Sequence, residues 1–135
     1  MNDKGTIRLE HTYPHAPARV WRALTTPALV ARWWGAGDLR AEVGHRFELD
    51  MGAWGRQPCE VVAVEPERLL RIRFAVTSLD TLITWRLTPE GDGTRLTLTQ
   101  EGFDLGSPMG VRAFEGMRAG WPAVLARIAP LLDEA

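Results

Sequence analysis

The chain has 135 residues, of which 45% are apolar and 24% are charged, and this balance is typical of a globular protein. The length fits one domain over residues 1–135 with an ordered core of about 6–133, and a chain of this size folds without a disulfide or a metal. The net charge of −1 argues against a nucleic-acid-binding protein, which usually carries a basic excess.

The N-terminal part predicts one strand and two short helices. Thr6–Tyr13 alternates apolar and polar side chains with a period of two, as a half-buried strand does. Pro17 then lies near the first turn of a short helix, and Pro27 opens a second helix that Thr26 can cap. Gly35–Asp38 ends this second helix, because glycine-rich sequence favours a turn.

Four or five further runs alternate in the same way and predict an antiparallel meander. Short turn segments separate them, and Glu90–Gly93 is a strong hairpin signal. The Val61-Val62 pair interrupts the alternation of its run, so the register of that strand stays open. The runs are Arg46–Met51, Pro58–Glu65, Leu70–Val76, Ile83–Thr88 and Arg95–Thr99.

From Ser107 onward the apolar period becomes that of a helix. Ser107 can cap it with Pro108 in the first turn, and apolar residues recur at steps of three and four as far as Leu132. Pro122 predicts a kink, or a break after Gly120. The whole pattern predicts an α+β fold: a curved antiparallel sheet of about six or seven strands, two short helices after the first strand, and a long C-terminal helix covering the sheet.

Several segments also match, in order, the pattern of a known family: Ala18–Pro27 followed by Trp33-Trp34-Gly35, then Leu82–Pro89, Gly93–Thr99, Glu101-Gly102-Phe103, and Gly120-Trp121 with Val124-Leu125 and Ile128. They resemble the START-like, or Bet v 1-like (SRPBCC), superfamily, and within it the homologues of the activator of the heat-shock-90 chaperone ATPase. The resemblance covers about residues 6–133. It implies the helix-grip fold with an internal cavity that takes lipids, plant hormones, polyketides or other hydrophobic molecules, and in a minority of members cyclisation or dehydration.

The inward-facing residues of these strands and helices are the candidate lining of that cavity. Six tryptophans are many for so short a chain, and a pocket can use some of them as walls. Each of these residues can equally pack against the others as core, so both interpretations stay open. The candidates are Trp33, Trp34, Phe47, Leu49, Met51, Ile72, Phe74, Trp85, Leu87, Leu98, Gln100, Phe114, Met117 and Trp121.

Few polar residues share the inward face. Gln100 either presents its amide to the cavity or returns to solvent at the end of its strand. His11 and Tyr13 follow the inward parity of the first strand and are possible polar contacts of a ligand. Arg118 either forms a surface pair with Glu115, three residues away, or turns inward to meet a ligand carboxylate.

The remaining reactive and charged groups have structural explanations. Cys59 has no histidine at a spacing that would activate it, and His11 and His15 lack the one-face geometry of a metal pair. We therefore expect no catalytic residue, no metal and no cofactor. Outward-facing arginines of neighbouring strands are expected to pair with glutamates such as Glu48 and Glu60; these arginines are Arg71, Arg73, Arg86 and Arg95.

These observations predict a protein that binds a small hydrophobic molecule of open identity. The alternatives are an enzyme acting on an apolar or polyketide-like substrate and a chaperone-associated interaction module, although the co-chaperones of the family carry a further N-terminal domain. The lone Cys59 and the absence of an apolar signal segment in residues 1–5 predict a cytoplasmic protein. No run of about 20 apolar residues is present, so we expect no membrane partner, and the net charge of −1 predicts no nucleic-acid partner. The oligomeric state stays open.

Overall fold

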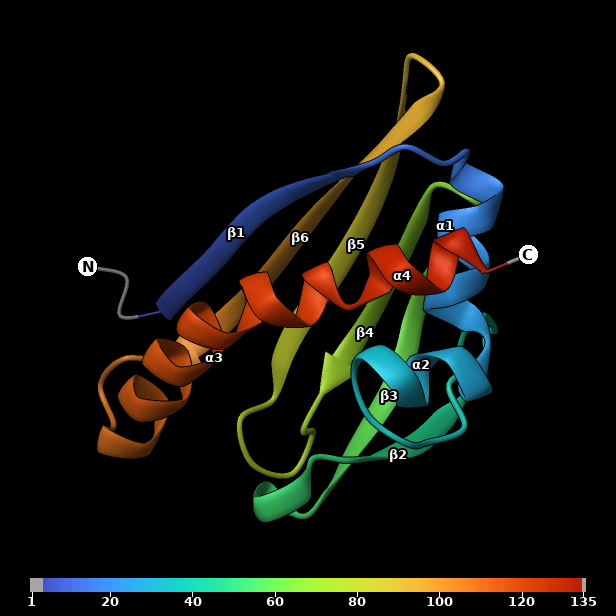
Figure 1. Ribbon diagram of the computed structural model, residues 1–135. Coiled ribbons are helices and arrows are strands. Elements are labelled where there is room, and N and C mark those ends of the chain that lie inside the picture. Colours follow the sequence, from blue (N-terminus) through green and yellow to red (C-terminus); the bar gives the residue numbers. More distant parts are fainter. Residues whose placement is uncertain (1–3, 135) are drawn as a thin grey trace.

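Six antiparallel strands form one sheet in the computed structural model, which describes residues 4–134 (Figure 1). The strand order is β1-β6-β5-β4-β3-β2, so β1 and β2 are the two edges. This is the α+β, helix-grip arrangement that the sequence predicts. In chain order the elements are β1 Lys4–Tyr13, α1 Pro17–Thr25, α2 Pro27–Trp33, β2 Arg46–Asp50, the short 3-10 helix η1 Gly52–Trp54, β3 Arg56–Glu65, β4 Leu69–Phe74, β5 Thr81–Glu90, β6 Gly93–Asp104, α3 Pro108–Ala126 and α4 Ile128–Asp133.

The strand register keeps the apolar residues on one face of the sheet. Ile72 of β4 lies opposite Val61 of β3 and Ile83 of β5, and all three side chains are fully buried. The register of β3 shifts between Val61 and Ala63, which leaves Val62 as an extra residue. A β-bulge at Val62 therefore explains why the Val61-Val62 pair interrupts the alternation in the sequence.

Several turns of the sheet place a residue in the left-handed backbone region, among them those that contain Gly91 and Ala75. Gly91 has a φ of 59° in the tight turn between β5 and β6, and glycine adopts this conformation without a steric penalty. Ala75 follows β4 with a φ of 55°. A strand cannot continue through such a residue, so β4 ends at Phe74 and not at Val76, where the alternation had placed its end.

The helix starts lie where the sequence predicts them, with one difference in capping. The Ser107 hydroxyl accepts a hydrogen bond from the Gly110 N–H at 3.0 Å, which confirms the predicted cap of α3. Thr26 occupies the cap position of α2, but its hydroxyl makes no capping hydrogen bond. Its carbonyl oxygen instead accepts from the N–H groups of Leu29 and Val30, both at 2.9 Å. The prediction that the Thr26 side chain caps α2 is therefore wrong.

The C-terminal helix breaks later than one of the sequence alternatives places it. α3 continues through Pro122 to Ala126, and the interruption falls at Arg127, so the break after Gly120 is not found. Proline lacks the N–H that would bond to the carbonyl four residues earlier, and its ring crowds that carbonyl, so the helix continues through Pro122 at the cost of both. The Arg127 N–H bonds to the Val124 carbonyl at 3.1 Å, a tightened last turn that ends α3.

Polar contacts tie the end of this helix to the N-terminal elements. The Tyr13 hydroxyl at the end of β1 donates to the Leu125 carbonyl at 2.7 Å, and the Arg19 guanidinium of α1 donates to the Leu132 carbonyl at 2.8 Å. Figure 1 shows α3 and α4 crossing in front of the sheet, and α3 contacts β1 and β6. None of the helices in the described part of the chain is both long and apolar enough to cross a membrane.

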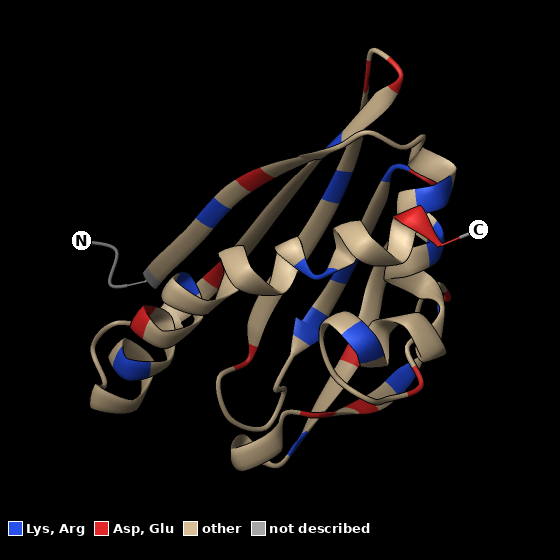
Figure 2. Cartoon of the chain, viewed as in Figure 1, with Lys and Arg blue, Asp and Glu red and all other residues tan. Residues whose placement is uncertain are grey.

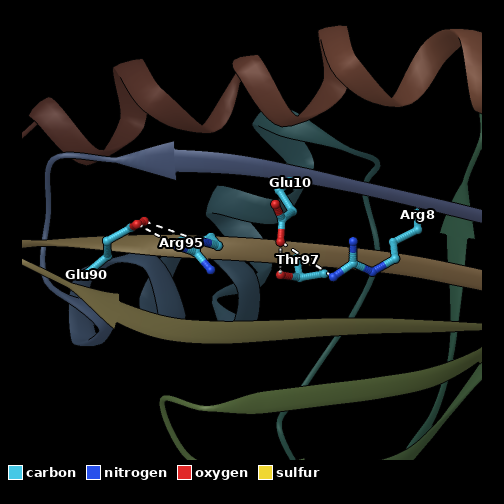
Figure 3. Close-up of polar contacts among 5 residues, drawn as sticks. All are labelled: Arg8, Glu10, Glu90, Arg95 and Thr97. Atoms are coloured by element: carbon cyan, nitrogen blue, oxygen red, sulfur yellow. Dashed lines mark hydrogen bonds and ion pairs between the residues drawn. The ribbon is translucent and has the colours of Figure 1, made fainter.

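Charged and hydroxyl side chains pair with each other along β1 and the β5–β6 hairpin (Figure 3). Arg95 donates to the Glu90 carboxylate at 2.6 and 3.2 Å, and Glu10 contacts Arg8 at 3.5 Å and the Thr97 hydroxyl at 3.4 Å. The Arg95 guanidinium holds the pKa of the Glu90 carboxyl below its ordinary value by hydrogen bonding to its charged form. These exposed pairs contribute little to stability.

The expected pairing of the outward arginines with glutamates is confirmed for Arg95, which pairs with Glu90, but it is wrong for Glu48 and Glu60, which pair with other arginines. These two glutamates lie on the β2–β3 pair, which supplies its own arginines, while Arg71 bonds to the Thr84 hydroxyl at 3.0 Å. Arg73 pairs with the turn residue Asp80 and Arg95 with Glu90 at the end of β5, while Arg86 forms no ion pair among residues 4–134. The ion pairs found instead are Arg73–Asp80 at 2.9 Å, Arg46–Glu60 at 3.6 Å and Arg56–Glu48 at 3.8 Å.

Candidate ligand-binding groove

A cluster of five aromatic side chains fills the interior between α2, α3 and the sheet. Trp34, just after α2, lies at its centre: its ring centroid is 5.3 Å from that of Trp85 and 5.7 Å from those of Phe74 and Trp121. It also stacks on Trp33 at 5.6 Å. Such pairs contribute roughly 0.5–1.5 kcal/mol each beyond their buried area. Side chains therefore occupy the centre of the interior, and open space lies beside this cluster.

Gln100 joins the cluster to the covering helix. Its side chain is fully buried, so it faces the interior and does not return to solvent. Its oxygen accepts from the Trp121 indole N–H at 2.8 Å, and its nitrogen donates to the Thr81 hydroxyl at 2.9 Å and contacts the Met117 sulfur at 3.4 Å. The Gln100 amide is thus hydrogen-bonded to neighbouring side chains of the protein.

The indole N–H of Trp85, unlike the amide of Gln100, has no hydrogen-bond partner among the described residues. Trp85 is 1% exposed, and its N–H meets no acceptor among residues 4–134. The neighbouring Trp33 donates to the Ala23 carbonyl at 2.8 Å. Leaving a buried donor unpaired costs about 1–3 kcal/mol.

Two adjoining hollows lie along α3, and together we call them the α3 groove. The first, of about 420 Å³, lies between α3, the η1 segment and the β4–β5 turn; the second, of about 310 Å³, lies between α3, the end of α2 and the end of β2. They share Met51, Gly116 and Met117. The first is also lined by Trp54, Gln57, Phe74, Ser78, Leu79, Met109, Arg112 and Ala113, and the second by Trp34, Asp50, Gly52, Gly120, Trp121, Val124 and Arg127.

Two glycines of α3 open the groove. Gly116 and Gly120 are four residues apart, one helical turn, so they share a face of the helix. Apart from the helix's own backbone, a Cβ atom built on either one would meet no atom of residues 4–134 within 4 Å. Glycine inside a helix is less favourable than alanine by about 0.8–1 kcal/mol, yet no contact within the described chain requires it at these positions.

Charge is unevenly distributed along the groove. Among residues 4–134, Arg112 is the one charged residue lining the first hollow, whereas Asp50 and Arg127 both line the second. Neither arginine forms an ion pair with any carboxylate of residues 4–134. Figure 2 shows the charged residues of α3 in its first half, followed by uncharged ribbon up to the interruption before α4. The groove is thus apolar along most of its length.

The rim of the first hollow exposes two large apolar side chains. Trp54 of η1 is 74% exposed and Met109 of α3 is 50% exposed. Both line the first hollow. Methionine is flexible and polarisable, so a rim and floor that include Met51, Met109 and Met117 can adapt to ligands of different shape.

A third hollow, of about 440 Å³, lies at the β2–β3 edge of the sheet and includes Cys59. Its charged lining is already paired within the protein, through the Arg46–Glu60 contact and the Arg73–Asp80 contact. Burial raises the pKa of the Cys59 thiol to about 11, which keeps it protonated and unreactive at neutral pH. This hollow therefore has fewer unpaired or reactive groups for a ligand than the α3 groove.

The structure distributes the sequence candidates between the groove and the core. Five of them line the groove: Trp34, Met51, Phe74, Met117 and Trp121. Phe47 lines the hollow at the β2–β3 edge. The others lie in the packed interior and line none of these three hollows: Trp33, Leu49, Ile72, Trp85, Leu87, Leu98 and Gln100.

The remaining candidates lie on the other side of α3 or at the far end of the sheet. Phe114 packs edge-on against Phe103 at 5.3 Å, and the exposed Arg118 lies over its ring at 5.4 Å, without an ion pair to Glu115 in the described residues. Tyr13 is buried and bonded to the Leu125 carbonyl, with the ring of His11 4.5 Å away. None of these residues lines the α3 groove.

Sequence reasoning missed most of the polar and small residues of the groove. A signal for some of them exists, because Met109, Arg112, Gly116 and Gly120 recur at steps of three and four and so continue one face of α3. Residues from η1, from the start of β3 and from the β4–β5 turn have no such periodicity; these are Trp54, Gln57, Ser78 and Leu79.

The groove carries few groups that could perform catalysis. In the described part of the chain its titratable side chains are Asp50, Arg112 and Arg127, without a histidine or a cysteine. Within residues 4–134 no group of three or more histidine, cysteine, aspartate or glutamate side chains lies close enough to hold a metal ion. The arrangement is suited to binding an apolar molecule that has one charged or polar end.

A comparison with protein families identifies the class to which this fold and groove belong. The model of the family described as activator of Hsp90 ATPase homolog 1-like protein matches residues 14–133, nearly the whole chain. The chain belongs to this family, which the sequence resemblance had indicated. No curated protein matches the chain.

Solved structures share the fold over their full length or over a part of it. The protein MLL2253 from Mesorhizobium loti is 36% identical, with a TM-score of 0.86 over 97% of this chain and 98% of its own. BH1534 from Bacillus halodurans is 26% identical, with a TM-score of 0.83 over 96% and 97%. DynU16, described as belonging to the dynemicin biosynthetic locus, is 27% identical with a TM-score of 0.79, over 99% of this chain and 48% of its own.

Proposed function

We propose that this protein binds a small hydrophobic molecule in the α3 groove. The observation that carries the proposal is the apolar surface left open between α3 and the sheet, next to the tightly packed cluster around Trp34. Hollows of about 420 and 310 Å³ lie at the lower end of the range of roughly 300–1,000 Å³ typical of ligand pockets. A small ligand is therefore favoured over a large one.

The make-up of α3 supports the same proposal. Gly116 and Gly120 face the groove, although alanine at these positions would strengthen the helix and meet open space. A ligand that approaches the helix backbone closely gives these glycines a role. The place of the similar protein DynU16 in a biosynthetic locus is also consistent with a small-molecule ligand for this fold.

The proposal is tested by a fluorescence titration with the neutral hydrophobic probe N-phenyl-1-naphthylamine. Trp34, Trp54 and Trp121 line the groove, so binding should quench tryptophan emission and transfer energy to the probe. Gly116→Leu places a side chain in the open space and should weaken binding at least tenfold. Ala119→Leu adds the same side chain to an exposed position of α3 outside the groove and should leave binding unchanged.

Wild-type protein that neither quenches nor transfers energy at any probe concentration would contradict the proposal. Equal loss of binding in both leucine variants would also contradict it, because the binding site would then lie elsewhere. Circular dichroism of the two variants separates loss of binding from loss of fold.

A further inference from the structure

We propose that the ligand of the α3 groove is an amphipathic organic acid, with its anionic group bound by Arg112 and its apolar part lying along α3. This inference rests on the function proposed above and adds the chemical class of the ligand. It is based on the unbalanced positive charge of Arg112 in the first hollow, whose lining is otherwise mostly apolar.

The first hollow carries a positive charge that the described chain does not balance. Arg112 is its one charged lining residue, and no carboxylate of residues 4–134 lies within ion-pair distance of its guanidinium. Glu115, three positions further along α3, is exposed and suitably spaced for a helical pair but does not form one. The guanidinium is thus available to a ligand carboxylate or a similar anion, to which it can donate two parallel hydrogen bonds.

The polar groups near Arg112 do not favour a ligand that is polar throughout. The Ser78 hydroxyl donates to the Gln57 side-chain oxygen at 3.3 Å, and the Gln57 nitrogen donates to the Trp54 carbonyl at 2.7 Å. These groups already have partners within the protein. The rest of the first hollow is lined by apolar side chains and glycine, so the ligand's other end is expected to be apolar.

The charges of the second hollow indicate which end of the ligand lies at Arg112. Asp50 and Arg127 both line it, so its charges balance, and the Asp50 carboxylate also accepts a hydrogen bond from the Gly52 N–H at 3.0 Å. An anionic group gains less there than at Arg112. Arg112 and Gly120 are eight residues apart, which is about 12 Å along a helix at 1.5 Å per residue. An apolar chain or ring system of this length would run from Arg112 past both glycines.

Two ligands of equal length separate charge from apolar surface: decanoate and 1-decanol, titrated by displacement of N-phenyl-1-naphthylamine at low salt. Arg112→Gln should weaken decanoate binding about fivefold, the size of an exposed ion pair, and leave decanol binding unchanged. Arg118→Gln removes an exposed arginine of the same helix outside the groove and should change neither affinity. Addition of 0.5 M NaCl should weaken decanoate binding to the wild type and leave decanol binding unaffected.

The outcomes distinguish the two proposals. If both ligands displace the probe and Arg112→Gln changes neither affinity, or changes both equally, the inference about an acid is overturned while the groove remains a binding site. If neither ligand nor probe binds the wild type, the proposed function itself fails. A dimer in analytical ultracentrifugation that Trp54→Ala dissociates would overturn the inference too, because a second copy would then cover the groove.

Discussion

The side-chain oxygen of Gln100 on β6 accepts a hydrogen bond from the indole N–H of Trp121 on α3 at a distance of 2.8 Å. Both side chains are buried, and the bond joins the sheet to the helix that covers it. Trp85 on the neighbouring strand is equally buried, yet its N–H has no partner in the described chain. The two tryptophans therefore form a matched pair for measuring what the Gln100 contact contributes.

We expect Trp121→Phe to destabilise the protein by about 1–3 kcal/mol more than Trp85→Phe. Both changes remove similar volume from the aromatic cluster, but only the first leaves the buried Gln100 oxygen without its donor. The second removes a donor that has no acceptor, which offsets part of the lost packing. Urea denaturation of the two variants measures the difference, and equal free energies of unfolding would show that the bond contributes nothing.

Gly116→Ala and Gly120→Ala should each raise the free energy of unfolding by about 0.8–1 kcal/mol, because alanine favours the helix and meets open space here. A change of this size corresponds to a rise of roughly 4 °C in Tm for a domain of this length. The same variants should weaken binding of N-phenyl-1-naphthylamine severalfold, since each methyl group narrows the groove. Thermal denaturation with a parallel titration tests both parts, and stabilisation without loss of binding would argue that the glycines do not serve a ligand.

Tyr13→Phe should cost about 1–2 kcal/mol of stability. The variant keeps the ring but leaves the buried Leu125 carbonyl, one of the last carbonyls of α3, without the hydroxyl that donates to it at 2.7 Å. Amide hydrogen exchange should accelerate in residues 124–133 more than in the β4–β5 region. Unchanged exchange at the α3–α4 junction would mean that other contacts hold this end of the helix.

The buried thiol of Cys59 should make the protein less stable at alkaline pH. Burial raises its pKa from the ordinary value of 9.0 to about 11, so between these values the unfolded chain releases a proton that the folded chain keeps. Stability is thus fully present below pH 9 and falls as the pH rises toward 11, by up to about 2–3 kcal/mol. Burial also raises the pKa of Tyr13, which adds to the loss at higher pH. Urea denaturation at pH 7, 9 and 10 should show a smaller fall for Cys59→Ala, and parallel curves for the two proteins would contradict this explanation.

The fold was largely predictable because the alternation of the strands and the period of the last helix are local signals. Ile72, Ile83 and Trp85 lie on the buried face as their parity indicates, and Ser107 caps α3 as its position indicates. The Arg73–Asp80 ion pair was not predictable, because it depends on a turn residue whose position follows from the tertiary structure.

The candidate site was predictable only in part for a similar reason. Parity identifies which residues face inward, but it does not decide which of them pack together and which border open space. Trp34 does both, since it contacts four aromatic rings and also lines the second hollow. Arg112 and Gly116 lie beside the apolar stripe of α3, where a sequence alone indicates solvent. Only the way in which α3 lies on the sheet places them along the groove.

The most direct test of ligand binding in the α3 groove is a titration of the isotope-labelled protein with N-phenyl-1-naphthylamine, followed by the NMR signals of the six indole N–H groups. Trp34, Trp54 and Trp121 line the groove, so their signals should shift together with one dissociation constant, while that of Trp21 on α1 should stay in place. Signals of these three tryptophans that do not move at saturating probe, or a larger shift at Trp21, would contradict the account.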